Sequence, residues 1–107
     1  MRLILAVISI LMLVVPAQAE TPLVTLSTGD DTRGWEAVGR LDMQPGSFCT
    51  ATLIAPDLVL TAGHCLYDPQ TGAQFDVGAM EFRAGWRNGR AAAYRKVRRA
   101  IAHPDYV

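Results

Sequence analysis

A histidine and a cysteine stand side by side just after an apolar run in this sequence. The run is Leu58 to Thr61, and Gly63 then precedes His64 and Cys65. An imidazole titrates near neutral pH, so it can accept a proton from a hydroxyl and later return it to a leaving group. A glycine lets the backbone turn tightly beside such a group. His64 is therefore a candidate for proton transfer, and the alternative, which these residues alone favour, is an ordinary histidine at the end of a strand with no catalytic role.

The elements that would position His64 are short strands. Four segments have the apolar or alternating pattern of strands, with turn residues between them: 35–41, 48–54, 58–61 and 79–85. The Pro-Gly pair within residues 43–47 predicts a turn between the first two, and Ala55-Pro56-Asp57 predicts a hairpin turn between the next two. Residues 20–34 and 67–78 are rich in glycine, proline and aspartate, which is typical of an irregular lead-in and a surface loop.

The stretch from Gly89 to His103 permits two interpretations. It is rich in alanine and arginine, and Tyr94, Val97 and Ile101 fall at helical spacing, so the local pattern favours a helix. The alternative is a long strand or hairpin with a solvated basic face.

The same part of the chain is strongly basic. Between Phe82 and Pro104 there is no acid and there are seven positive residues: Arg83, Arg87, Arg90, Arg95, Lys96, Arg98 and Arg99. Such a stretch is either an anion-binding patch for a partner or polyanion, or a solvated edge that resists pairing with other chains. We favour the solvated edge.

Composition limits the classes of function. The chain has 107 residues, half of them hydrophobic, and a formal net charge of zero. This length suits one small domain with a packed core, and the hydrophobicity argues against disorder. Zero net charge gives no general attraction to nucleic acid or to an anionic membrane, so neither is expected as a partner.

The first residues predict export. A positive start at Met1-Arg2 precedes an almost continuous apolar run, Leu3 to Val15, and then Pro16 to Ala19 with an A-x-A pattern. This is the pattern of a signal-peptide helix over residues 1–19, cleaved after Ala19. The alternative is an uncleaved membrane anchor, but the run is short of the ~20 residues that a spanning helix needs. We therefore expect a secreted or periplasmic protein with no stable membrane anchor after cleavage.

Export bears on the two cysteines, Cys49 and Cys65. In an oxidising compartment an even pair most simply forms one disulfide, and two buried free thiols are the alternative if the chain is not exported. A metal site has little support, because His64 and Cys65 are adjacent while His103 is far away in sequence. Neither a C-x-x-C nor an H-x-x-x-H spacing occurs.

Four stretches occur in an order that carries a family resemblance. They are WEAVGRL (35–41), GSFCTATLIAPDLV (46–59), LTAGHC (60–65) and IAHPDY (101–106). In turn they resemble the first barrel strand, the strand with the partner cysteine and its hairpin, the catalytic-histidine motif, and the His-Pro-x-Tyr stretch of the trypsin/chymotrypsin family of serine proteases. The histidine motif together with the upstream cysteine is the specific part of the resemblance.

The resemblance implies an all-β fold in which residues 20–107 form most of one antiparallel trypsin-like barrel. It implies strands rather than a helix within 89–103, and we follow it there because tertiary context overrides local propensity. His64 would be the general base and acid, and a Cys49–Cys65 disulfide would anchor it. A disulfide closing a loop of that length contributes ~3 kcal/mol in the chain-entropy model. No metal and no organic cofactor are implied.

The chain also departs from the family pattern. Nothing in it matches the nucleophilic serine, the oxyanion hole or the specificity pocket, which belong to the second barrel of the same domain. Ser47 sits in a turn without a Gly-Asp-Ser-Gly context, and His103 and Asp105 lie inside the His-Pro-x-Tyr stretch, so none of the three is assigned a catalytic role. Arg33-Gly34 is a poor match to an activation site. We expect the coding sequence to continue past Val107.

The function expected from this resemblance is peptide-bond hydrolysis by an exported serine endopeptidase acting on peptide or protein substrates. The 107-residue chain by itself is expected to be inactive, because His64 lacks its aspartate and serine. The alternative is a secreted, non-catalytic binding module that retains the barrel.

Overall fold

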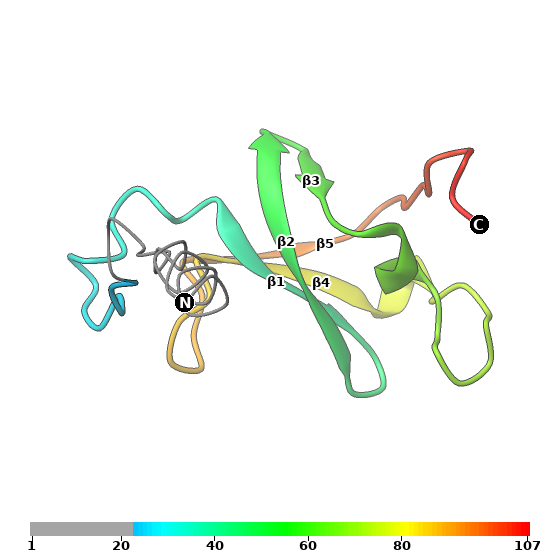
Figure 1. The fold of residues 1–107 in the computed structure, drawn as a ribbon, viewed down its shortest axis with the longest axis horizontal. Coiled ribbons are helices and arrows are strands. Elements are labelled where there is room, and N and C mark those ends of the chain that lie inside the picture. The colour runs from blue at the N-terminus through cyan, green and yellow to red at the C-terminus, as the bar shows by residue number, and fades with distance from the viewer. Residues whose placement is uncertain (1–22) are drawn as a thin grey trace, which may run out of the picture.

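Alternating apolar residues form the strands of a single antiparallel sheet in the computed structural model, which describes residues 23–107. The strands are β1 (Val38–Met43), β2 (Ser47–Ala55), β3 (Leu58–Leu60), β4 (Met80–Ala84) and β5 (Ala93–Lys96). Within the described residues they lie in the order β3-β2-β1-β4-β5. The sheet curls into a half-barrel (Figure 1). Two 3₁₀ turns lie between β3 and β4 in the chain, η1 (Gly63–Leu66) and η2 (Val77–Ala79).

One face of the sheet carries the core. Leu41 and Met43 of β1 point to the same side as Met80 and Phe82 of β4, and all four are buried. Ala51 of β2, together with Cys65 and Leu66 of η1, joins this cluster. The turn that contains the histidine motif is therefore packed against the sheet.

The central strand β1 depends on a glycine. Gly39 is paired with Ala51 of β2 on one side and with Ala84 of β4 on the other. A Cβ at Gly39 would overlap the backbone carbonyl of Arg83. Only glycine therefore allows β1 and β4 to approach this closely.

Most predicted strands are confirmed, with shifted ends. The segments predicted at 48–54, 58–61 and 79–85 correspond to β2, β3 and β4. The segment predicted at 35–41 was wrong at its start, because Trp35 lies in a turn in which Val38 N–H donates to the Trp35 carbonyl, and β1 begins only at Val38. The turn predicted within residues 43–47 is present, and Gly46 there has a φ of 82°, which favours glycine.

The helix that local pattern favours in residues 89–103 is absent, and the family expectation of a strand is confirmed for part of it. Ala93–Lys96 forms β5, paired antiparallel with β4 in the register Arg83↔Tyr94. Hydrogen bonding to β4 engages one edge of this backbone in an extended form, so the local preference for helix is overridden. Residues 97–103 form neither helix nor strand.

The predicted signal peptide, residues 1–19, lies outside the described residues. Among residues 23–107, no helix combines the length and the apolar character needed to cross a membrane.

Candidate functional site

His64 is positioned by the way in which β3 ends. The Thr61 hydroxyl donates a 2.9 Å hydrogen bond to the Thr50 carbonyl of β2, which ties the end of β3 to its neighbour. The backbone then enters η1, where the Cys65 N–H donates to the Ala62 carbonyl at 3.0 Å. This single tight turn places His64 one residue before a buried position. Its own side chain stays exposed.

A disulfide anchors the residue next to His64. Cys49 on β2 is bonded to Cys65 on η1, with their Cα atoms 6.2 Å apart and a sequence separation of 16. That Cα separation falls within the usual range of about 4.4–6.8 Å. Cys65 is only 5% exposed and belongs to the core. The predicted pairing is confirmed, and it joins the histidine turn covalently to the middle of the sheet.

The imidazole of His64 is free within the part of the chain that the structure describes. No hydroxyl, carboxylate or amide of residues 23–107 hydrogen-bonds to it. The Thr61 hydroxyl, three residues earlier, donates to the Thr50 carbonyl. Asp105 does not orient it: the Asp105 carboxylate lies 3.8 Å from Nδ1 of His103, and both side chains are strongly exposed. Ser47 lies at the start of β2 opposite Met43.

Two tyrosines accompany the histidine turn, and sequence reasoning did not assign them to the site. The rings of Tyr67 and Tyr106 are stacked, with centroids 5.8 Å apart and 19° between their planes. Tyr106 also lies against Gly63, since a Cβ there would be 2.8 Å from Cδ2 of the ring. The His-Pro-x-Tyr motif was the available signal, because it contains Tyr106, which lies against Gly63. Figure 1 shows the C-terminal segment on the same side of the sheet as η1.

The two cysteines and the histidine also form a compact set of metal-ligand types. The sulfurs of Cys49 and Cys65 and a ring nitrogen of His64 lie within 4.8 Å of one another. Metals bind cysteine as the thiolate, and in this structure the two sulfurs are bonded to each other. In the oxidised chain, the imidazole is therefore the one strong ligand of this set.

The basic stretch is mainly surface, as expected. Five of its seven positive side chains are exposed: Arg90, Arg95, Lys96, Arg98 and Arg99. Arg83 is half-buried and paired with Asp42 and Glu81. The hydrogen bond with Glu81 and the nearby carboxylates raise the pKa of Arg83 above its ordinary value.

The fold and this site define a class of protein: a curled, all-β half-barrel that presents a disulfide-anchored histidine at the end of a strand. The sequence model of the Trypsin family matches residues 28–107. The chain belongs to the trypsin family, and its five strands form an incomplete trypsin-like barrel. Searches of curated proteins and of solved structures found no match.

Proposed function

We propose that this chain is the histidine-bearing part of an exported serine endopeptidase that cleaves peptide bonds with a Ser-His-Asp triad. The observation that carries the proposal is the geometry of His64, which is exposed in the turn after β3 and followed by a buried, disulfide-bonded Cys65. Membership of the trypsin family supports it. In this role His64 takes the proton of a serine hydroxyl and then gives it to the leaving amine.

The other catalytic groups come, in this proposal, from outside residues 23–107. A triad histidine needs an acid at one ring nitrogen and a hydroxyl at the other, and none of the described residues supplies either to His64. We expect the aspartate, the serine and the oxyanion donors alongside a second barrel of the same domain. The substrate is a peptide or protein, bound in a pocket that this second barrel would form.

The proposal also includes export and processing. Residues 1–19 have the sequence of a signal peptide, and cleavage after Ala19 would leave Glu20 at the N-terminus. Mass spectrometry of the secreted protein should detect that terminus, and a mature protein that retains residues 1–19 would contradict it. The proposal includes no nucleic-acid partner. Heparin is a polyanion, so the protein should elute from a heparin column at moderate salt.

The test of function uses the two histidines of the chain as a matched pair. The coding sequence beyond codon 107 is read, expressed together with this chain, and assayed on a peptide library. His64→Ala should lower kcat by about 10⁶-fold, the cost of removing a triad histidine. His103→Ala should leave kcat unchanged, because among residues 23–107 the exposed His103 side chain forms polar contacts only with Asp105 of its own turn. Equal activity of the two variants would refute the proposal.

The chain of 107 residues by itself should not hydrolyse peptides. Proteases that lack one triad member keep ~10³–10⁴-fold acceleration through the oxyanion hole and substrate binding, and neither is expected here. Cleavage that is abolished by His64→Ala and by a serine-directed inhibitor would reveal a nucleophile within this chain.

A non-catalytic binding module is the second candidate. The observation that favours it is the absence of any hydrogen bond to the His64 imidazole from residues 23–107. A stop codon directly after codon 107, or an extended protein whose activity does not depend on His64, would support this candidate over the endopeptidase.

A further inference from the structure

A groove lies at the end of the sheet away from η1. It has a volume of about 490 Å³ and separates the segment before β1 from the hairpin that joins β4 to β5. Figure 1 shows these two segments together on the side of the sheet opposite the histidine turn. Small-molecule sites typically enclose about 300–1,000 Å³, so the groove has the size of a ligand site.

The apolar walls of the groove are the two tryptophans of the chain. Trp35 comes from the turn before β1 and is 58% exposed, and Trp86 follows β4. The guanidinium groups of Arg40 and Arg83 each lie 5.2 Å from the Trp86 ring centre, which holds this indole in place. Two large aromatic surfaces thus line one open groove, with Leu26 beside them.

Two arginines face each other at the same groove. Arg87 and Arg90 exchange backbone hydrogen bonds of 2.8 and 3.0 Å, so they are directly opposite across the hairpin and their side chains leave it on one face. Like charges in that arrangement repel. Both residues line the groove, and no carboxylate of residues 23–107 forms an ion pair with either of them.

Two acidic groups lie close to these arginines, and both already accept hydrogen bonds. Glu36 lines the same groove, and its carboxylate accepts a 2.8 Å hydrogen bond from the Gly34 N–H. Asp31 feels the charge of Arg87, but its carboxylate accepts hydrogen bonds from the N–H and the hydroxyl of Thr28, at 2.9 and 2.8 Å. Arg87 itself reaches only a backbone carbonyl, that of Ser27, at 3.5 Å. Within residues 23–107, the Arg87–Arg90 pair thus forms no ion pair, and its positive charge can meet an anion from outside.

We propose that this groove binds a small organic anion with a flat apolar body and one carboxylate group. The body packs against Trp35 and Trp86, and the carboxylate lies between the guanidinium groups of Arg87 and Arg90, whose forked donors match a carboxylate. Binding relieves the repulsion between the two arginines. The peptidase reaction proposed above does not use this site, so the two proposals stand independently.

The test follows the two indole N–H signals in ¹H–¹⁵N spectra of the labelled protein. The chain has only two tryptophans, and both line the groove. Their indole signals therefore report directly on binding in the groove. Titration with 2-naphthoate should shift both signals saturably. The neutral, isosteric 2-naphthamide should bind at least tenfold more weakly, and added salt should weaken the naphthoate alone.

Variants separate the paired arginines from general basic charge. Arg87→Gln with Arg90→Gln should weaken naphthoate binding at least tenfold, whereas Arg98→Gln with Arg99→Gln, which removes the same charge from the exposed surface, should have no effect. If the first double variant unfolds, the single Arg90→Gln variant and the salt titration decide. Equal binding of naphthoate and naphthamide, equal loss in both double variants, or no indole shift would overturn the proposal. So would an acidic peptide that binds at the arginines without moving the indoles, since it would identify a polypeptide partner.

Discussion

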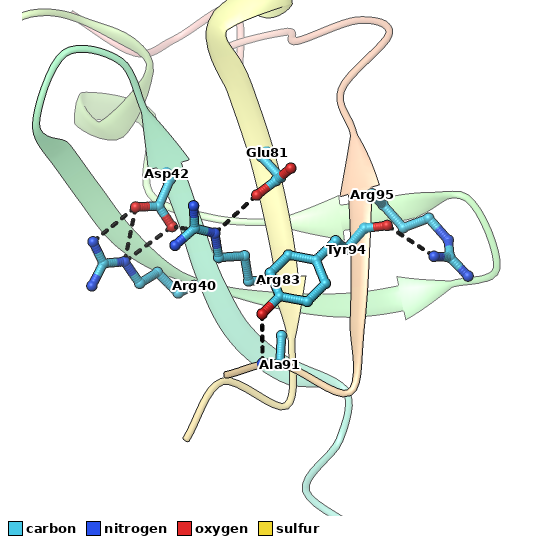
Figure 2. A network of polar contacts seen from close by, with 7 residues as sticks. All are labelled: Arg40, Asp42, Glu81, Arg83, Ala91, Tyr94 and Arg95. Carbon is cyan, nitrogen blue, oxygen red and sulfur yellow. Dashed lines mark hydrogen bonds and ion pairs between the residues drawn. The ribbon is translucent and has the colours of Figure 1, made fainter. Parts of the chain in front are cut away.

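Among residues 23–107, Asp42 is the charged residue that is buried. Replacing it by asparagine should destabilise the sheet measurably. Its carboxylate accepts from Arg40 the single Nε–H, shared between both oxygens at 3.0 Å, and an Nη2–H at 2.8 Å. On the neighbouring strand, Nε of Arg83 lies 3.3 Å from the same carboxylate. Figure 2 shows this carboxylate between the two guanidinium groups, so Asp42→Asn leaves two adjacent cations without their shared anion.

The magnitude follows from burial. The Asp42 side chain is 11% exposed and that of Arg40 is 28% exposed, so the pair lies between the surface and buried cases. Exposed ion pairs contribute ~0.2–1 kcal/mol and breaking a buried one costs ~3–5 kcal/mol, which gives about 1–3 kcal/mol for Asp42→Asn. With a urea m-value of about 1 kcal/mol/M for a domain of this size, the unfolding midpoint should fall by about 1–3 M.

The chain supplies a matched control. Asp30 forms an equally direct pair with Arg33, at 2.5 Å, but these two side chains are 87% and 78% exposed. Asp30→Asn should therefore leave the urea midpoint unchanged within error.

A double-mutant cycle between Arg40→Gln and Asp42→Asn should show a coupling energy that accounts for most of the loss. Equal midpoint shifts for the Asp42 and Asp30 variants, or no coupling with Arg40, would refute the assignment of stability to this buried pair.

Three further outcomes are expected. Reducing the disulfide should lower the free energy of unfolding by ~3 kcal/mol, the cost of releasing a loop of this length; an unchanged urea midpoint would contradict this. Gly39→Ala should cost about 1–3 kcal/mol, because its Cβ would overlap the Arg83 carbonyl. Gly78→Ala is the control: the atoms nearest to its Cβ would be 3.5 Å away, so it should leave the urea midpoint nearly unchanged. The pKa of Asp31 should lie below 3.8 because of hydrogen bonds from the hydroxyl and N–H of Thr28, and Thr28→Val should raise it in an NMR titration. The pKa of Asp31 is lower in the folded state than in the unfolded state. The stabilisation that results is therefore present above the unfolded-state pKa of about 4 and is lost as the pH falls through the folded-state pKa.

The histidine turn could be predicted from sequence because its determinants are local. An apolar strand, a glycine and the His64-Cys65 pair follow one another directly, and only one other cysteine exists to bond with Cys65. The turn within residues 43–47 and the strands around it could be predicted for the same reason, since proline and glycine act on their own backbone.

β5 shows where local reasoning fails. Helix preference is worth only a few tenths of a kcal/mol per residue, and the alanines and arginines around Tyr94 favour a helix on that scale alone. Pairing with β4 satisfies those backbone donors and acceptors of Ala93–Lys96 that face β4. The outcome is decided by a strand edge whose residues lie 9 to 15 positions earlier in the chain, beyond the few residues on which helix propensity depends.

The sequence by itself indicated the class of fold, the candidate histidine and its disulfide through four short stretches that resemble the trypsin family, because such motifs are local. The tertiary structure alone decided which distant groups share a place: Tyr106 against Gly63, Asp42 between two arginines, and Trp35 and Trp86 lining one groove. The physical reason is that these contacts depend on the register and curl of the sheet. Both are set by the packing of all the strands together, and neither is written in any one segment.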